Sequence, residues 1–280
     1  MDASNPYVLG IASSVTATIL TSVAWWGLGR LKARDHLISF LKLSRSQGSI
    51  IFYGNVHKEQ LARTRKSASK EYATFEYGDI AATLLVYDRV KSVRGLKVTH
   101  TVGANSASTP KGNVISIGGP KWNKVTEKFI GAIGSPLYFR PGCVGVIERR
   151  KLHNHENCHA PSIETRSPGR QTICDYGVIL CARSGYLDSG IPCALVLAGY
   201  STYGVLIAAE YLVSCSPTDI RKLKKRLSGD RRFGFLIKGT AEVAPHGQVV
   251  SITHKELVAD IPEREFLEPY EYQYDQEKAP

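Results

Sequence analysis

Residues 113–134 read NVISIGGPKWNKVTEKFIGAIG, and this stretch decides the fold class predicted for the chain. Its first five residues form a short apolar run typical of a buried strand. Two glycines and a proline follow at 118–120, where a tight turn is expected. The remaining residues carry the apolar spacing of a helix. A strand that runs through a glycine turn into a helix is the unit from which α/β sheets are built.

A second unit of the same kind is predicted between residues 193 and 213. The run CALVLA (193–198) predicts a buried strand, Gly199 ends it, and TYGVLIAAEYLV (202–213) predicts a helix. Further strands are predicted at 49–53, 96–102, 233–238 and 249–254, and further helices at 76–93 and 219–227. Strands that alternate with helices favour parallel pairs joined by crossovers. We therefore expect an α/β fold with a Rossmann-like, mostly parallel sheet, and the short β runs between 137 and 183 predict a β-rich insertion at its edge.

An uncharged segment near the N-terminus predicts one transmembrane helix. Residues 7–28 (YVLGIASSVTATILTSVAWWGL) contain no charged side chain, and as a helix they reach about 33 Å, slightly more than a hydrocarbon core. Three basic residues follow at positions 30–34, whereas residues 1–6 contain no Lys or Arg. This charge bias predicts a single-pass protein with its N-terminus outside and its C-terminal domain in the cytoplasm. The alternative, a buried core helix, fits poorly because the segment has no polar face.

Four regions follow from these features: a membrane anchor (1–34), a linker helix (35–48), a cytoplasmic domain (49–254) and an acidic C-terminal tail (255–280). The chain has 43% hydrophobic residues, which excludes a disordered or multi-pass protein.

Its net charge of +11 makes an anionic partner plausible. The densest basic block, RKLKKR at 221–226, is expected to contact anionic lipid headgroups, with a solvated surface as the alternative. It lacks the interleaved aromatic residues of nucleic-acid-binding segments, so no specific nucleic acid is expected.

Small residues at three predicted strand ends indicate a ligand site, because ligands of open α/β sheets bind beyond such ends. Glycine lets the backbone approach a phosphate, Asn, Ser and Thr can donate to phosphate or ribose oxygens, and Tyr offers a stacking face. The candidate ligand-binding residues are Gly54, Asn55, Gly118, Gly119, Pro120, Asn123, Gly199, Tyr200, Ser201, Thr202 and Gly204. They predict a nucleotide-like ligand, although neither a dinucleotide fingerprint nor a P-loop occurs at these turns. The alternative is that tight strand-to-helix turns simply need glycine.

Metal and disulfide chemistry receive little support from the sequence. Residues 153–159 (HNHENCH) gather three histidines and a cysteine, but closed zinc sites draw ligand pairs from two separated places, so a solvated loop is expected and no metal. No cofactor is predicted. The six cysteines lack the spacing of a disulfide framework, and we expect them to be thiols in a reducing compartment.

No motif identifies a catalytic residue. The carboxylates near the predicted crevice are Glu76, Asp79, Glu127 and Glu210. Carboxylates at such positions more often serve the helix dipole or face solvent. One of them could still act in cleavage of an N-glycosidic bond, which needs little more than a carboxylate in a binding pocket.

In overall plan, a short anchor joined to a ligand-sensing domain, the chain resembles the membrane-anchored effectors of bacterial antiviral nucleotide signalling. The resemblance covers the architecture and rests on no residue motif. It implies a nucleotide-binding sensor that acts by ligand-driven assembly of homo-oligomers, because a single span cannot enclose a pore. The alternatives are a nucleotide or NAD glycohydrolase, and a membrane scaffold that binds no small ligand.

Overall fold

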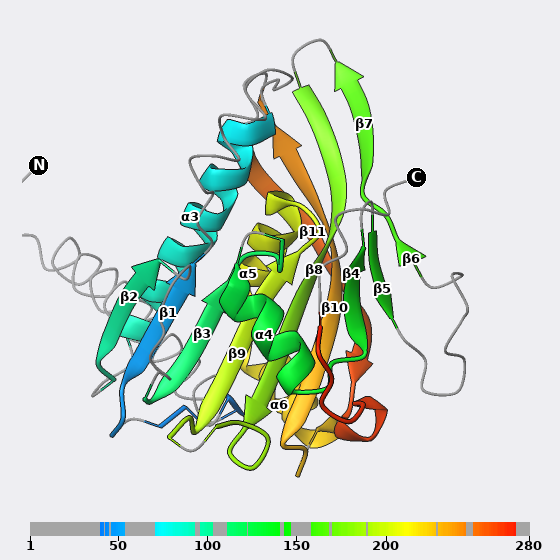
Figure 1. Cartoon of the computed structure of the whole chain (residues 1–280). Coiled ribbons are helices and arrows are strands. Elements are labelled where there is room, and N and C mark those ends of the chain that lie inside the picture. Colours follow the sequence, from blue (N-terminus) through cyan, green and yellow to red (C-terminus); the bar gives the residue numbers. More distant parts are fainter. Residues whose placement is uncertain are drawn as a thin grey trace, which may run out of the picture.

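The computed structural model describes residues 40–41, 43–44, 46–53, 71–92, 96–102, 111–121, 123–140, 143–146, 158–167, 170–188, 190–227, 229–244 and 249–272. A mixed eight-stranded sheet forms the centre of the domain (Figure 1), with the order β11-β10-β8-β9-β3-β1-β2 and β7 paired to β8. Its strands are β1 (Ser49–Tyr53), β2 (Val98–Val102), β3 (Asn113–Ile117), β7 (Ser162–Ser167), β8 (Arg170–Arg183), β9 (Cys193–Gly199), β10 (Arg232–Val243) and β11 (Val249–Ile261). A second sheet contains β4 (Leu137–Arg140), β5 (Cys143–Val146) and β6 (Cys158–His159).

The expectation of a Rossmann-like, mostly parallel sheet is wrong. Only β2, β1, β3 and β9 run parallel to one another, whereas β9, β8, β10 and β11 form antiparallel pairs. The segment predicted as an edge insertion contains β8, a 14-residue strand between β9 and β10. Antiparallel neighbours need no crossover helix. The strand passes through Asp175 and Gly177, which interrupt its apolar pattern.

Gly177 lies inside β8 because α5 (Thr202–Ser214) packs directly on the strand there. A Cβ atom at Gly177 would lie 2.5 Å from the carbonyl oxygen of Gly204 and 2.7 Å from the backbone nitrogen of Ala208. Gly177, which interrupts the apolar pattern of the strand, therefore provides a close contact between helix and strand.

Four of the predicted helices are present, whereas within the predicted linker helix (35–48) residues 40–41 are helical and the other described residues, 43–44 and 46–48, are not. Besides α5, the described residues contain α3 (Glu71–Lys91), α4 (Lys124–Ala132) and α6 (Pro217–Arg226). Among these helices none is long and apolar enough to cross a membrane. The predicted span at 7–28 lies outside the described residues.

The centre of the main sheet is buried on both faces, as the alternation along β9 demonstrates. Leu195 and Leu197 pack in one apolar cluster with α3, α5 and α6, whereas Val196 packs in the opposite cluster with α4, β4 and β5. Both clusters contain fully buried side chains. The domain is thus three layers deep, with the main sheet in the middle.

The described residues within 40–44 of the N-terminal segment are hydrogen-bonded to three central strands. Arg183 of β8 donates to the carbonyl of Phe40 at 2.8 Å, and the Cys193 thiol of β9 donates to that of Leu41 at 3.3 Å. Asn113 of β3 exchanges two hydrogen bonds with the backbone of Ser44. Phe40 and Leu41 are themselves buried in the core.

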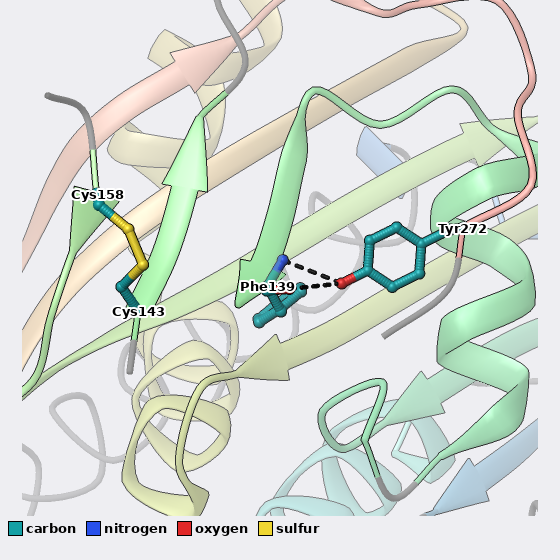
Figure 2. The surroundings of a disulfide bond; sticks show 4 residues. All are labelled: Phe139, Cys143, Cys158 and Tyr272. Atoms are coloured by element: carbon teal, nitrogen blue, oxygen red, sulfur yellow. Dashed lines mark hydrogen bonds between the residues drawn. A yellow bond between two sulfur atoms is a disulfide. The ribbon is translucent and has the colours of Figure 1, made fainter. Parts of the chain in front are cut away.

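Residues 262–272 fold back over α4. Phe266 is buried, the N–H of Tyr270 donates to the carbonyl of Gly131 at 3.1 Å, and the Tyr272 hydroxyl bonds both the N–H and the carbonyl of Phe139 (Figure 2). These contacts fix the end of β4, and with it Phe139, which lines the candidate ligand crevice.

A disulfide joins Cys143 of β5 to Cys158 of β6 (Figure 2), with the Cα atoms 5.8 Å apart. The expectation that all six cysteines are thiols is therefore wrong for this pair. Strand pairing brings the two together, because Gly145, two residues after Cys143, pairs with Cys158. The other four cysteines are free: Cys174, Cys181, Cys193 and Cys215.

Candidate functional site

A crevice lies where the chain leaves β3 and β9. These strands are parallel neighbours, but the helices that follow them pack on opposite faces of the sheet, α4 in one cluster and α5 in the other. Ligands of open α/β sheets bind where connections diverge in this way. The local geometry of the parallel half of the sheet therefore suffices to form such a crevice, although the sheet as a whole is mixed.

The two glycine turns predicted as a ligand site meet in this crevice. A Cβ atom at Gly119 would lie 2.8 Å from the carbonyl oxygen of Gly199, so the backbones of the turns are in close contact. The crevice is lined by Asp79, Gly119, Pro120, Lys121, Phe139, Gly199, Tyr200, Ser201, Thr202 and Val205. The predicted residues among them are Gly119, Pro120, Gly199, Tyr200, Ser201 and Thr202.

Three predicted residues serve the turns rather than the crevice lining. Gly118 adopts a φ of 114°, a conformation that favours glycine, and its N–H donates to the carbonyl of Leu197 at 2.9 Å. Gly204 faces β8, where a Cβ atom would lie 2.4 Å from the carbonyl oxygen of Tyr176. Asn123 caps α4. The remaining two predicted residues, Gly54 and Asn55, lie outside the described residues.

All polar groups of the Asn123 side chain are engaged within the protein. Its carbonyl oxygen accepts from the N–H groups of Val125 and Thr126, at 3.0 and 3.3 Å, which caps the start of α4. Its amide donates to the Ser116 hydroxyl at 3.1 Å and to the Ile117 carbonyl at 2.8 Å. Asn123 is also buried, so it holds the turn together and offers no donor to a ligand.

The start of α5 is capped by a buried carboxylate. Asp175 of β8 accepts hydrogen bonds from the Ser201 hydroxyl and from the N–H of Gly204, the latter at 2.8 Å. The Ser201 oxygen in turn accepts from the N–H of Tyr203 at 3.1 Å. Burial raises the pKa of Asp175, and the hydrogen bonds from Ser201, Tyr176 and Gly204 act in the opposite direction.

Asp79 is the one carboxylate of the crevice lining. It lies on α3, and burial raises the pKa of its carboxyl to about 7. No described hydrogen bond or ion pair satisfies this carboxyl group, and the helix places it next to Thr202 in the lining. Asp79 is therefore a group whose polar atoms remain available to a ligand.

The other carboxylates considered from sequence have different roles. Glu127 forms an ion pair with Lys124 one turn away on α4, and Glu210 forms one with Lys255 at 3.6 Å. The Glu76 side chain is not among those described. Of the four candidates, the structure thus brings Asp79 to the crevice.

Sequence reasoning missed Lys121, Phe139 and Val205 as lining residues. Lys121 directly follows the glycine–proline turn, and that adjacency was the available signal. It is exposed, but desolvation lowers the pKa of its ammonium group. Phe139 arrives from β4 through tertiary packing and carries no local signal.

The crevice is shallow. With the open space at its mouth it measures about 330 Å³, whereas the cavity itself measures about 20 Å³. The larger value is at the low end of small-molecule sites, and the smaller corresponds to roughly one water. The smaller volume decides what can enter fully: a single small group, with the rest of a ligand lying across the mouth.

Metal chemistry has no geometric support in the described part of the chain, which contains no group of three or more metal-ligating side chains. Positions 153–157 of the histidine-rich segment lie outside the described residues. His159, the last of that segment, has its ring 4.9 Å from the ring of Tyr176.

Comparison of the chain with protein-family models finds no match, and comparisons with curated proteins and with solved structures find none either.

Proposed function

We propose that the domain binds a nucleotide-like small molecule in the crevice between β3 and β9 and acts as the sensor of a membrane-anchored effector. One observation carries the proposal: two glycine turns from separate strand–turn–helix units meet beside Asp79, whose carboxyl has no described partner. Gly119 and Gly199 both line the crevice, and a polar group without a partner is stabilised when a ligand supplies one.

A ligand in this crevice contacts residues that belong to, or precede, three different helices. Gly119 precedes α4, Thr202 begins α5 and Asp79 belongs to α3. The contact between α3 and α5 is close, since a Cβ atom at Gly78 would lie 1.8 Å from Oγ1 of Thr202. Binding at Asp79 and Thr202 therefore acts on the position of α3 relative to α5.

Assembly of several chains is proposed to follow from this movement. Ile80 and Leu84 lie one turn apart on α3 and are 51% and 63% exposed. Ile80 is adjacent to Asp79, so a shift of α3 alters an apolar surface suited to a second copy of the chain. Ligand drives assembly only if it binds the assembled state more tightly.

The test uses the full-length chain in detergent, titrated with mono-, di- and cyclic nucleotides and NAD while thermal unfolding is followed. At least one compound should raise the midpoint of unfolding. Lys121→Ala should weaken the effect, and Lys124→Ala, one turn away and paired with Glu127, should not. A chain whose unfolding responds to no compound would favour the scaffold alternative.

A nucleotide or NAD glycohydrolase is the second candidate, and the pKa of Asp79, about 7, favours it. A carboxyl that titrates near neutral pH can serve as a general acid or base. In that case the full-length chain releases free base from a nucleotide, Asp79→Asn stops the release, and Glu127→Gln does not. Absence of a product, with binding intact, favours the sensor.

Anionic lipid headgroups are proposed as the partner of α6. Five basic side chains of this helix are exposed: Arg221, Lys222, Lys224, Lys225 and Arg226. One guanidinium, that of Arg183, bonds both the Asp230 carbonyl just beyond α6 and the Phe40 carbonyl of the N-terminal segment. The basic helix thus lies at the end of the domain where the chain arrives from the predicted anchor.

A further inference from the structure

The amino ends of α4 and α5, which the sequence suggested as phosphate sites, are both closed by the protein itself. The first turn of α5 is bonded to Asp175 and Ser201, and that of α4 to Asn123. A phosphate at a helix amino end needs free N–H groups and a positive local field. The caps remove most of the donors, and Asp175 adds a carboxylate directly behind Ser201.

The inner crevice therefore has acidic rather than basic character. Asp79 lines it, Asp175 lies beneath its Ser201 wall, and the lining residue with a positive charge, Lys121, is exposed. In their ionised forms these two carboxyl groups disfavour a phosphate in the same place, because like charges repel. An uncharged group that donates hydrogen bonds fits there instead.

We propose that the crevice takes its nucleotide-like ligand sugar-first: ribose hydroxyls donate to the Asp79 carboxylate, and the phosphate stays at the mouth beside Lys121. This inference rests on the proposed function and adds the orientation and the recognised group. A carboxylate that accepts from two neighbouring hydroxyls is a chemically suitable partner for a ribose diol. The small inner volume, roughly that of one water, admits a hydroxyl group of the ribose, while the sugar ring and the base lie across the mouth.

The neighbouring side chains complete the arrangement. Tyr200 is half-buried in the lining and offers a ring to the base or sugar, and Phe139 presents an apolar wall. Phe139 is held in place through its backbone by the hydroxyl of Tyr272 (Figure 2). A ligand that binds in this orientation contacts β4, α3 and both glycine turns.

The test measures binding to the full-length chain by saturation-transfer NMR and calorimetry. The probes are the four ribonucleosides, their 5′-monophosphates, their 2′,3′-dideoxy counterparts and pyrophosphate. For the base that binds, the nucleoside should bind within a few-fold of its monophosphate, with the strongest saturation on the ribose protons. The dideoxynucleoside should bind about tenfold more weakly or worse, as expected from loss of hydrogen bonds to a charged group.

Two variants of α3 provide the matched pair. Asp79→Asn should weaken nucleoside binding by about tenfold, whereas Asp88→Asn, an exposed position on the same helix, should leave it unchanged. Equal binding of the dideoxy compound, or displacement of the nucleoside by pyrophosphate, would overturn the sugar-first orientation while leaving nucleotide binding intact. Failure of every nucleoside and nucleotide to bind would overturn the proposed function as well.

Discussion

Oδ2 of Asp175 accepts a hydrogen bond from the backbone N–H of Gly204 at 2.8 Å, and this bond fixes the first turn of α5 to the middle of β8. The same oxygen accepts from the Ser201 hydroxyl. One buried carboxylate thus joins the antiparallel half of the sheet to the helix that borders the ligand crevice. The position of that helix depends on a charge that no local sequence pattern reveals.

Replacement of Asp175 by Asn should destabilise the protein by roughly 2–4 kcal/mol, because an amide group offers one acceptor oxygen where the carboxylate has two, and its NH₂ faces other donors. Chemical unfolding of the full-length protein measures the loss. Asp188→Asn is the control, since Asp188 is exposed and its ion pair with Lys128 spans 3.9 Å. Equal stability of the two variants would contradict the role assigned to Asp175.

Asp79 should make the free protein less stable as the pH rises. Its pKa is raised from 3.8 to about 7, so the folded state retains a proton that the unfolded chain loses. Stability should therefore fall between about pH 4 and pH 7 by roughly 2–4 kcal/mol and level off above. Asp79→Asn should remove this part of the pH profile and stabilise the protein at pH 8.

Unfolding midpoints of the wild type, Asp79→Asn and Asp88→Asn at pH 5 and pH 8 measure this effect. A variant that is more stable yet binds ligand more weakly is typical of a functional residue. An unchanged pH profile in Asp79→Asn would show that its carboxyl is not desolvated.

Gly177→Ala should be strongly destabilising, by about 3 kcal/mol or more, because the new methyl group meets the backbone of α5, which cannot move independently. Lys238→Ala, at an exposed position of the neighbouring strand β10, should change stability by less than about 0.5 kcal/mol. Unfolding curves of both variants compare the two. A tolerated alanine at Gly177 would mean that α5 does not rest on β8 as described.

The Cys143–Cys158 disulfide should be recoverable as a linked peptide pair from protein that is digested without reduction. Replacement of both cysteines by Ser should lower stability by about 3 kcal/mol relative to the oxidised protein, the entropic effect of a loop of about 15 residues. A reducing agent should abolish the difference between the two proteins.

Trapping of thiols in intact cells compares this bond with the predicted topology. A cytoplasmic domain, as the basic flank at 30–34 predicts, should yield both cysteines as thiols in the cell and oxidised only after extraction. A bond already present in the cell would place the domain in an oxidising compartment and contradict the predicted orientation.

The positions of several strands could be predicted because their signals are local, although the mostly parallel sheet was wrong. β1 and β3 occupy the predicted residues, since short apolar runs bounded by glycine are read from neighbours alone. β8 cannot be recognised as one strand from the sequence, because Asp175 and Gly177 interrupt its apolar pattern. Both residues serve α5, a contact that exists only after folding. Tertiary contacts of this kind leave no periodicity in the sequence.

The residues of the candidate site likewise fall into those that could be predicted from the sequence and those that could not. The glycine turns were predictable from turn chemistry, and Asp79 was identified as one of four carboxylates without a reason to prefer it. Its selection requires knowledge of which helix face meets the crevice. Phe139 reaches the lining from a separate small sheet, and its place depends on the bond from Tyr272, distant in sequence.

The attachment of residues 40–44 determines how mechanical load enters the domain. A pull along the N-terminal segment acts through Arg183, Cys193 and Asn113, which belong to the neighbouring strands β8, β9 and β3. The tension is therefore divided among three central strands and cannot peel away an edge strand alone. If the predicted anchor at 7–28 holds the chain in a membrane, load from it would reach these three central strands first.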